Sequence, residues 1–317
     1  MKLRIGLDVG GTTLKAGVVD EHYRVLAHAS LPTNPGRPAA AMLDDMATVC
    51  KNAAAAAGLS LADVYAVGAG FPGTCNLETG EMEYANNLEL SHVFACDELK
   101  QRLGVPVFME NDANAAAFGE YLAGAGRGSR NFVCLTLGTG VGGGAVLNGK
   151  LLRGFNFAGG EFGHVVIVAD GEPCACGRRG CYEAYASVSA LIRQTQAAMT
   201  AHPESGLWQA APTLEDVDGK TAFLAARAGD ATAQAVLDAY LRFVGIGVVN
   251  VINVFQPDVL CIGGAISKEG EALLTPIREQ VKAERYSKYA QKQCNICAAA
   301  LGGDAGLVGA AFSDTLL

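Results

Sequence analysis

One histidine and three cysteines lie close together near the middle of the sequence, in the stretch HVVIVADGEPCACGRRGC (residues 164–181). These four residues, His164, Cys174, Cys176 and Cys181, form the ligand inventory of a structural Cys₃His zinc site. A disulfide is disfavoured because Cys174 and Cys176 are too close in sequence for a relaxed bridge. The full set closes the zinc tetrahedron and leaves no open catalytic position, so we expect a structural Zn²⁺ ion. The alternative is a loop of free thiols.

Two glutamates are interleaved with these ligands. Glu161 precedes His164 by three residues, and Glu183 follows the last cysteine by two. A bound zinc ion would fix both carboxylates, and His164 could bind it through one ring nitrogen while the other donates a proton to a ligand oxygen. We therefore expect Glu161, His164 and Glu183 to hold the hydroxyls of a sugar ring. Alternatively, the two glutamates only support the zinc ligands or lie on the surface.

A second candidate site lies in the stretch MENDANAAAFGE, where Asn111 and Asp112 fall between a predicted strand and a predicted helix. Ligands of α/β sheets bind at the carboxyl ends of strands, where an amide and a carboxylate suit adjacent sugar hydroxyls. Phosphoryl transfer to an alcohol needs a group that accepts the hydroxyl proton, and a carboxylate in that role contributes about 10²–10⁴-fold. The alternative is that Asp112 is only the N-cap of the helix.

Two glycine-rich turns, DVGGTT (8–13) and LGTGVGGG (137–144), each separate two predicted strands. Successive glycines expose backbone N–H groups in a concave nest that binds phosphate oxygens. Neither turn matches a P-loop or a glycine motif that opens a helix, so a Rossmann fold is excluded. Asp8 is well placed to meet Mg²⁺ through water. The first hairpin aligns with the second at an offset of 128 residues, which indicates two related halves, or chance similarity between two glycine hairpins.

Composition narrows the class of protein. The chain has 317 residues, of which 50% are hydrophobic and 18% charged, and a net charge of −8. About two domains are expected at this length. An acidic chain without a basic cluster lacks the electrostatic attraction for nucleic acid or anionic membranes, so we expect neither as a partner. The N-terminus reads as a strand rather than a signal peptide, and the apolar stretch 243–255 reads as too short to span a bilayer. We expect a cytoplasmic protein.

The elements that position these residues alternate between strands and helices. Strands are expected at 3–7, 16–19, 25–30, 64–69, 107–109, 132–137, 144–147, 258–262 and 296–300, and helices at 38–57, 97–103, 114–122, over 221–254, up to about 285 and at the C-terminus. A further pair, Cys294 and Cys297, has no second ligand pair nearby, and we interpret it as incidental.

Taken in order, the motifs resemble those of the ROK (repressor, open reading frame, kinase) family of sugar kinases, within the actin/hexokinase/Hsp70-like superfamily. The similarity covers essentially the whole chain. The residues that carry it are DVGGTTLKAG (8–17), GFPG (70–73), ENDANAAA (110–117), LGTGVGGG (137–144), GGEFGH (159–164), CACGRRGC (174–181) with Glu183, and IGGAIS (262–267). Thr13 departs from the Lys or Asn more usual in the family, so we assign it no role.

The resemblance implies an α/β fold of two ribonuclease-H-like (actin/hexokinase-type) lobes with a ligand cleft between them. The lobes would be residues 1–118, completed by the C-terminal helix at 301–317, and residues 119–300 with the zinc loop 164–181. It implies a homodimeric hexose kinase that uses ATP and Mg²⁺, with Asp112 as the general base. The sugar would be held by Gly73, Asn87, Asn111, Asp112, Glu161, His164 and Glu183, the nucleotide by Asp8, Gly10, Gly11, Thr12, Gly138, Thr139, Gly140, Gly263 and Gly264, and zinc by His164, Cys174, Cys176 and Cys181.

The substrate is less sharply defined. Residues 86–121 are more similar to bacterial glucokinases than to N-acetylmannosamine kinases, so we expect glucose. N-acetylmannosamine, N-acetylglucosamine or another hexose is the alternative, and a sugar-sensing protein without catalysis is a remote one. ROK repressors carry a DNA-binding domain before the kinase-like body, and we expect none here because the first phosphate hairpin begins at Ile5.

Overall fold

The computed structural model describes residues 2–316. Its contacts divide the chain into two compact units. One, here the N-terminal unit, comprises Met1–Cys134, Gly143–Gly160 and Ala300–Leu317, and the other, the C-terminal unit, comprises Leu135–Gly142 and Glu161–Ala299. The two units are described separately below.

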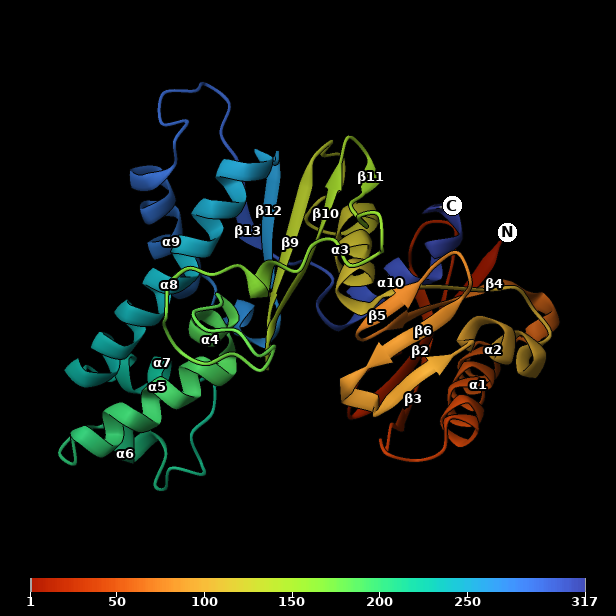
Figure 1. Cartoon of the computed structure of the whole chain (residues 1–317), viewed down its shortest axis with the longest axis horizontal. Coiled ribbons are helices and arrows are strands. Elements are labelled where there is room, and N and C mark those ends of the chain that lie inside the picture. The colour runs from red at the N-terminus through yellow and green to blue at the C-terminus, as the bar shows by residue number, and fades with distance from the viewer. Residues whose placement is uncertain (1, 317) are drawn as a thin grey trace. The chain divides into compact units, whose positions relative to one another are not determined.

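The N-terminal unit contains a five-stranded sheet with the order β3-β2-β1-β4-β8 (Figure 1). Its strands are β1 (Leu3–Val9), β2 (Thr13–Val19), β3 (Val25–Pro32), β4 (Val64–Phe71) and β8 (Val107–Asn111). The first three strands are antiparallel, whereas β4 runs parallel to both β1 and β8. Parallel neighbours need a crossover connection, and the crossovers here contain α1 (Ala39–Ala56) and α2 (Ala95–Leu103).

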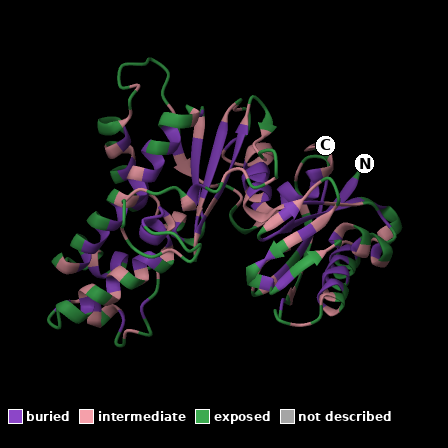
Figure 2. Ribbon diagram, viewed as in Figure 1, coloured by how far each residue is buried: buried purple, intermediate pink, exposed green. Residues whose placement is uncertain are grey.

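Alternation along β1 places different residues on the two faces of this sheet. Leu3, Ile5, Leu7 and Val9 are buried in one apolar cluster with residues of α1. On the other face, α10 (Ala305–Ala311) packs against β1, β4 and α3 (Asp112–Ala123). Helices therefore cover both faces of the sheet. Strands β1, β2 and β4 are largely buried, whereas the edge strand β3 alternates between half-buried and exposed residues (Figure 2).

Glycines allow α10 to approach the sheet at backbone distance. A Cβ atom on Gly68 would lie 1.7 Å from the carbonyl oxygen of Ala310, and one on Gly6 would lie 1.9 Å from that of Leu307. No side chain fits in either space. The C-terminal residues of the chain are therefore part of the core of the N-terminal unit.

A small three-stranded sheet of β5 (Thr74–Asn76), β6 (Glu81–Ala85) and β7 (Leu90–Val93) follows β4. The sequence predicts no strands here, because strands of three to five residues between short turns give too few alternations to be recognised.

A second five-stranded sheet has the order β11-β10-β9-β12-β13. Its strands are β9 (Phe132–Leu137), β10 (Val141–Leu147), β11 (Lys150–Leu151), β12 (Val259–Gly263) and β13 (Asn295–Ala298), and the last two are parallel. Each five-stranded sheet thus has a strand–glycine turn–strand hairpin followed by a third strand at one edge and by two later strands at the other. This shared order agrees with the sequence similarity between the two hairpins.

The helices of the C-terminal unit are α4 (Glu183–Ala186), α5 (Val188–Ala201), α6 (Leu207–Ala210), α7 (Thr221–Arg227), α8 (Ala231–Phe255) and α9 (Glu271–Glu284). The helical pattern expected over 221–254 is interrupted between α7 and α8. Gly229 has a φ of 93° there, and the Asp230 side chain accepts a hydrogen bond from the N–H of Ala233 to begin α8.

Helix α8 corrects one expectation. The apolar stretch 243–255 by itself reads as too short to span a bilayer, but the helix that contains it begins at Ala231 and runs for 25 residues, so its length and composition would allow a crossing. The residues before 243 belong to the same helix, as the helical pattern expected over 221–254 indicates. In the structure α8 packs against α5, α7 and α9, and 61% of its most apolar window is buried. It is a core helix of the C-terminal unit.

Candidate functional site

Asn111 is the last residue of β8, and Asp112 is the first residue of α3. The Asn111 side-chain oxygen accepts hydrogen bonds from the N–H groups of Ala113 (3.0 Å) and Asn114 (3.1 Å) and so caps the helix. The alternative that Asp112 is the N-cap is therefore wrong. Its carboxylate lies in the first turn, where one oxygen accepts from the N–H of Ala113 (2.8 Å) and the helix dipole stabilises negative charge.

Capping restricts what Asn111 can offer a ligand. Its oxygen is occupied by the helix, and its amide nitrogen donates to the carbonyl of Gly73 (3.1 Å), which leaves one N–H for a substrate. Gly73 has a φ of 83°, and a Cβ atom there would lie 2.1 Å from the carbonyl oxygen of Tyr84, so only glycine fits. Asn87 is exposed, and its Cβ lies 3.4 Å from where a Cβ on Gly11 would be.

A buried ion pair that the sequence analysis did not identify lies directly before these residues. The Glu110 side chain is 2% exposed and accepts from Arg153 Nε (2.8 Å) and Nη2 (2.7 Å). Its other oxygen accepts from the Asn111 N–H (3.0 Å) and the Asn114 amide (3.2 Å). Arg153 also donates to the carbonyl of Leu316 (2.9 Å). The pair thus holds the start of α3, and the only hint in the sequence was a glutamate at the end of an apolar strand.

The first glycine turn is closed by its own backbone. The Gly10 N–H donates to the carbonyl of Thr13 (3.1 Å), and the Thr33 hydroxyl donates to the carbonyl of Gly10 (2.6 Å). Within residues 2–316, the N–H groups of Gly11 and Thr12 make no backbone hydrogen bond. They are the donors that this turn can offer to a phosphate oxygen.

Asp8 lies on β1 just before this turn. Burial raises the pKa of its carboxyl group, and the Lys15 ammonium offsets only part of that effect. An ionised Asp8 is therefore destabilised in the free protein. A divalent cation near Asp8 would relieve this cost, as expected for a carboxylate that meets Mg²⁺.

The second glycine turn makes comparable contacts within the C-terminal unit. The Gly138 N–H donates to the carbonyl of Gly140 (2.9 Å), and the Val188 N–H donates to the carbonyl of Gly138 (2.8 Å). Thr139 is exposed at its tip. Gly263 ends β12, and the next residue, Gly264, has a φ of 89°, so that a Cβ there would lie 2.1 Å from the carbonyl oxygen of Leu137. The predicted phosphate and adenosine residues of this unit thus lie together.

The four predicted zinc ligands converge. One ligand atom from each of His164, Cys174, Cys176 and Cys181 lies within 4.8 Å of the others. Tetrahedral zinc with bonds of about 2.3 Å to sulfur and about 2.05 Å to nitrogen would separate two sulfurs by about 3.8 Å, and sulfur from nitrogen by about 3.6 Å. The Cys176 and Cys181 sulfurs are 3.7 Å apart, and the Cys174 sulfur is 3.6 Å from His164 Nδ1. The donor set and its spacing fit zinc.

The loop that carries these ligands is folded by tight turns. The Cys174 N–H donates to the carbonyl of Arg178 (2.9 Å), and the Gly177 N–H donates to that of Cys174 (3.0 Å). Gly177 and Gly180 have φ angles of 86° and 76°, and a Cβ on Gly180 would lie 1.7 Å from the carbonyl of Val168. These glycines bring the cysteines together. His164 presents Nδ1 to the cluster, so its other ring nitrogen is directed elsewhere.

The two glutamates beside the cluster differ in their contacts. Glu161 is exposed and precedes a 3₁₀ turn at Phe162–His164. Glu183 is half-buried and accepts from the N–H of Val141 (2.9 Å). Glu183 is therefore a packed residue rather than a free surface carboxylate.

The predicted residues thus form two groups. Those in the N-terminal unit are Asp8, Gly10, Gly11, Thr12, Gly73, Asn87, Asn111 and Asp112, and those in the C-terminal unit are Gly138, Thr139, Gly140, Glu161, His164, Cys174, Cys176, Cys181, Glu183, Gly263 and Gly264.

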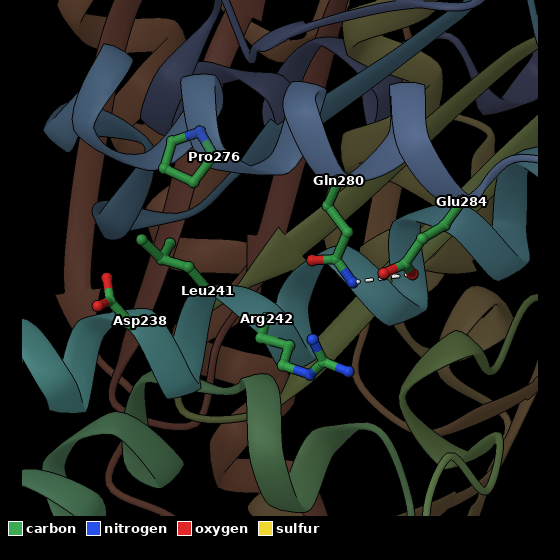
Figure 3. Close-up of a pocket in the computed structure, with 6 residues that line it drawn as sticks. All are labelled: Asp238, Leu241, Arg242, Pro276, Gln280 and Glu284. Atoms are coloured by element: carbon green, nitrogen blue, oxygen red, sulfur yellow. Dashed lines mark hydrogen bonds between the residues drawn. The ribbon is translucent and has the colours of Figure 1, made fainter.

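A separate pocket of about 450 Å³ lies between α8 and α9 (Figure 3). It is lined by Asp238, Leu241, Arg242, Pro276, Gln280 and Glu284. None of these is a predicted site residue, and Gln280 is engaged with Glu284 (3.1 Å). The pocket is not part of the candidate site.

The chain contains two five-stranded sheets, each with a glycine hairpin, together with one carboxylate at the start of a helix and one Cys₃His cluster. These features and the similar solved structures define an α/β protein of the actin/hexokinase-like class. The ROK family model matches residues 4–313, and the chain belongs to the ROK family. The resemblance inferred from the motifs is confirmed.

The relatives are similar over nearly their whole length. The chain is 38% identical over 314 residues to a glucokinase of Streptomyces coelicolor, covering 98% of this chain and 97% of the relative. It is 39% identical to a ROK family glucokinase of Streptomyces griseus solved in complex with glucose and AMPPNP, with 98% of each chain covered and a TM-score of 0.83. It is 34% identical to a ROK hexokinase of Thermus thermophilus, with 98% and 97% covered and a TM-score of 0.79.

Proposed function

We propose that this chain is an ATP-dependent glucokinase that transfers a phosphoryl group from ATP to the 6-hydroxyl of glucose. The observation that carries the proposal is its full-length similarity to a ROK glucokinase that binds glucose and AMPPNP. N-acetylmannosamine, N-acetylglucosamine or another hexose is the alternative substrate. A panel of these sugars, compared by kcat/KM, tests the choice, and a preference for an N-acetylated hexosamine would contradict it.

Asp112 is the proposed general base. Its carboxylate is fixed at the start of α3 by the Ala113 N–H and lies next to the capping Asn111. Phosphoryl transfer to an alcohol requires little of the protein beyond positioning, charge stabilisation and acceptance of the hydroxyl proton. Asp112 would accept that proton. The single free N–H of Asn111 would donate to a neighbouring sugar oxygen.

Further sugar contacts are proposed for the other predicted sugar-binding residues. Gly73 and Asn87 would approach the ring with backbone or amide groups, and Glu161, His164 and Glu183 would accept from or donate to ring hydroxyls. Hydroxyl-specific contacts of this kind give strong discrimination, because an analogue that lacks the hydroxyl leaves buried polar groups unpaired.

The nucleotide would be held mainly by backbone donors. We propose that Gly11 and Thr12 in the first turn, and Thr139 and Gly140 in the second, donate to phosphate oxygens. Gly10 and Gly138 would shape the turns, and Gly263 and Gly264 would flank the adenosine. Asp8 would hold Mg²⁺ through water, and the ion would neutralise charge on the phosphates.

The Cys₃His cluster would hold a structural Zn²⁺ ion through His164, Cys174, Cys176 and Cys181. Bound zinc would supply rigidity and no open coordination position. We further propose a cytoplasmic homodimer. The lobe boundaries expected from the sequence, 1–118 with 301–317 and 119–300, remain a prediction.

The base assignment is tested by Asp112→Asn. Turnover of glucose should fall by about 10²-fold or more, while glucose binding measured by calorimetry is retained. Asp97→Asn is the matched control, because Asp97 is also an aspartate in the first turn of a helix in the same unit. Near-normal turnover by Asp112→Asn would rule out its role as the base.

The zinc assignment is tested by Cys176→Ser. The variant should lose stoichiometric zinc, measured by elemental analysis, and should bind glucose more weakly. Cys294→Ser is the control, because that cysteine lies outside the cluster. Wild-type protein without zinc would show that the cluster is misassigned.

A further inference from the structure

Glu183 contacts the second glycine turn as well as the metal cluster. One carboxylate oxygen accepts from the N–H of Val141 (2.9 Å), and a Cβ on Gly140 would lie 2.3 Å from that oxygen. The other oxygen lies 3.8 Å from the sulfur of Cys174. One side chain thus spans the distance from a predicted zinc ligand to the turn predicted to bind phosphate.

The backbone around Glu183 makes the same connection. Cys181 is a member of the cluster, and the next residue, Tyr182, donates its N–H to the carbonyl of Val165 (2.8 Å). The Tyr182 ring is fully buried, and its hydroxyl donates to the carbonyl of Val244 in α8 (2.9 Å). At the other end, the Val188 N–H donates to the carbonyl of Gly138 (2.8 Å). The segment 181–188 is therefore anchored at the cluster, in the core and at the turn.

These contacts determine which backbone N–H groups of the turn at 138–141 can donate to a phosphate. The Gly138 and Val141 N–H groups are engaged with Gly140 and Glu183. Within residues 2–316, the N–H groups of Thr139 and Gly140 make no backbone hydrogen bond and can donate to a phosphate. Their directions depend on the conformation of the turn, which Glu183 holds from outside.

We propose that Glu183 is a positioning residue for nucleotide binding, and that it couples the glycine turn at 138–141 to the occupancy of the Cys₃His cluster. Zinc would fix Cys174, whose sulfur lies 3.8 Å from Glu183, and Cys181, which precedes Glu183 by two residues. Loss of the metal would free both, loosen Glu183 and so weaken nucleotide binding. The inference deepens the proposed function, because it rests on this turn binding phosphates.

The first test measures AMPPNP binding by calorimetry without sugar, in the presence of Mg²⁺. Glu183→Ala should weaken binding by about tenfold or more, since it removes the charged acceptor of a backbone N–H. Glu183→Gln retains an oxygen acceptor and should restore most of the affinity. Glu172→Ala is the control, an exposed glutamate of the same loop, and should bind like the wild type. Glu183→Ala should keep its zinc, because it removes no ligand.

The second test measures the coupling. Removal of zinc with a chelator, or by Cys176→Ser, should weaken AMPPNP binding in the wild-type background but cause no further loss in Glu183→Ala. Additive losses would overturn the coupling, as would unchanged AMPPNP affinity after removal of the metal.

These experiments separate the inference from the proposed function. If Glu183 is only a sugar ligand, Glu183→Ala loses glucose binding but binds AMPPNP as tightly as the wild type, and the inference fails alone. Wild-type protein that does not bind AMPPNP would instead overturn the proposed function.

Discussion

Replacing Arg153 with methionine would leave the buried carboxylate of Glu110 without its ion-pair partner. The two side chains are 17% and 2% exposed, and they meet through two contacts of 2.7 and 2.8 Å. Removing one member of a buried pair costs about 3–5 kcal/mol, because the remaining charge is uncompensated. For a domain of about 150–250 residues, each kcal/mol lowers Tm by about 2–4 °C. Arg153→Met should therefore lower Tm by about 6–20 °C.

The double variant Glu110→Gln/Arg153→Met distinguishes the loss of an ion pair from general disruption. The double variant has no unpaired buried carboxylate at position 110. Replacing a buried ion pair by uncharged groups of similar size often changes stability little. The double variant should thus be more stable than Arg153→Met alone. Arg102→Met is the control, because Arg102 pairs with exposed carboxylates of Asp44 and Glu98 and should cost at most about 1 kcal/mol.

The coupling between Glu110 and Arg153 is measured by a double-mutant cycle. Thermal unfolding, followed by circular dichroism, is compared for the wild type, Glu110→Gln, Arg153→Met and the double variant. Residues in contact should show a coupling energy of about 0.5–3 kcal/mol. Turnover should fall as well, because Glu110 accepts the Asn111 N–H and so fixes the start of the helix that carries Asp112. Additive changes in Tm, or Arg153→Met as stable as Arg102→Met, would refute the reasoning.

Two further predictions concern packing and pH. Gly68→Ala should destabilise the protein by about 3 kcal/mol, because the new methyl would meet the carbonyl of Ala310 at 1.7 Å; Gly303→Ala, which has open space, should unfold like the wild type. Asp8→Asn should raise Tm at pH 7.5, because burial raises the Asp8 pKa and the ionised form opposes folding; the gain should vanish as the pH falls toward 3.8. Asp63 has the opposite sign, since the Ser60 side chain lowers its pKa, so Asp63→Asn should lower Tm at pH 7.5. Equal responses of the two aspartate variants would contradict the assignment.

The sequence predicted those features that depend on residues close together in the chain. The two glycine hairpins, the helix that begins beside Asp112 and the convergence of the four cluster residues each depend on short spacings and turn residues. The structure confirms all three, although it assigns the cap of α3 to Asn111. Asn and Asp are both good N-caps, and the choice depends on where the strand ends, which periodicity fixes only to within a few residues.

What the sequence could not predict is contact between distant residues. Glu110 and Arg153 are 43 positions apart, and Val141 and Glu183 are 42 apart. A glutamate in an apolar strand indicates that a partner exists, but the partner's identity depends on the path of the intervening backbone. The helical pattern over 221–254 predicts most of α8, but the three helices that it packs against, α5, α7 and α9, could not be predicted from that pattern.

The backbone N–H groups of the two glycine turns differ in whether they are available to bind a phosphate. In the first turn the Gly10 N–H is engaged with Thr13, and in the second the Gly138 N–H is engaged with Gly140. In each turn, therefore, the first glycine closes the bend, and the N–H groups of the next two residues make no backbone hydrogen bond within residues 2–316. The equivalent use of donors in two hairpins on two sheets is difficult to explain by chance similarity of glycine-rich segments. It favours two related halves, and in the second of them the Glu183 carboxylate accepts from the turn's Val141 N–H.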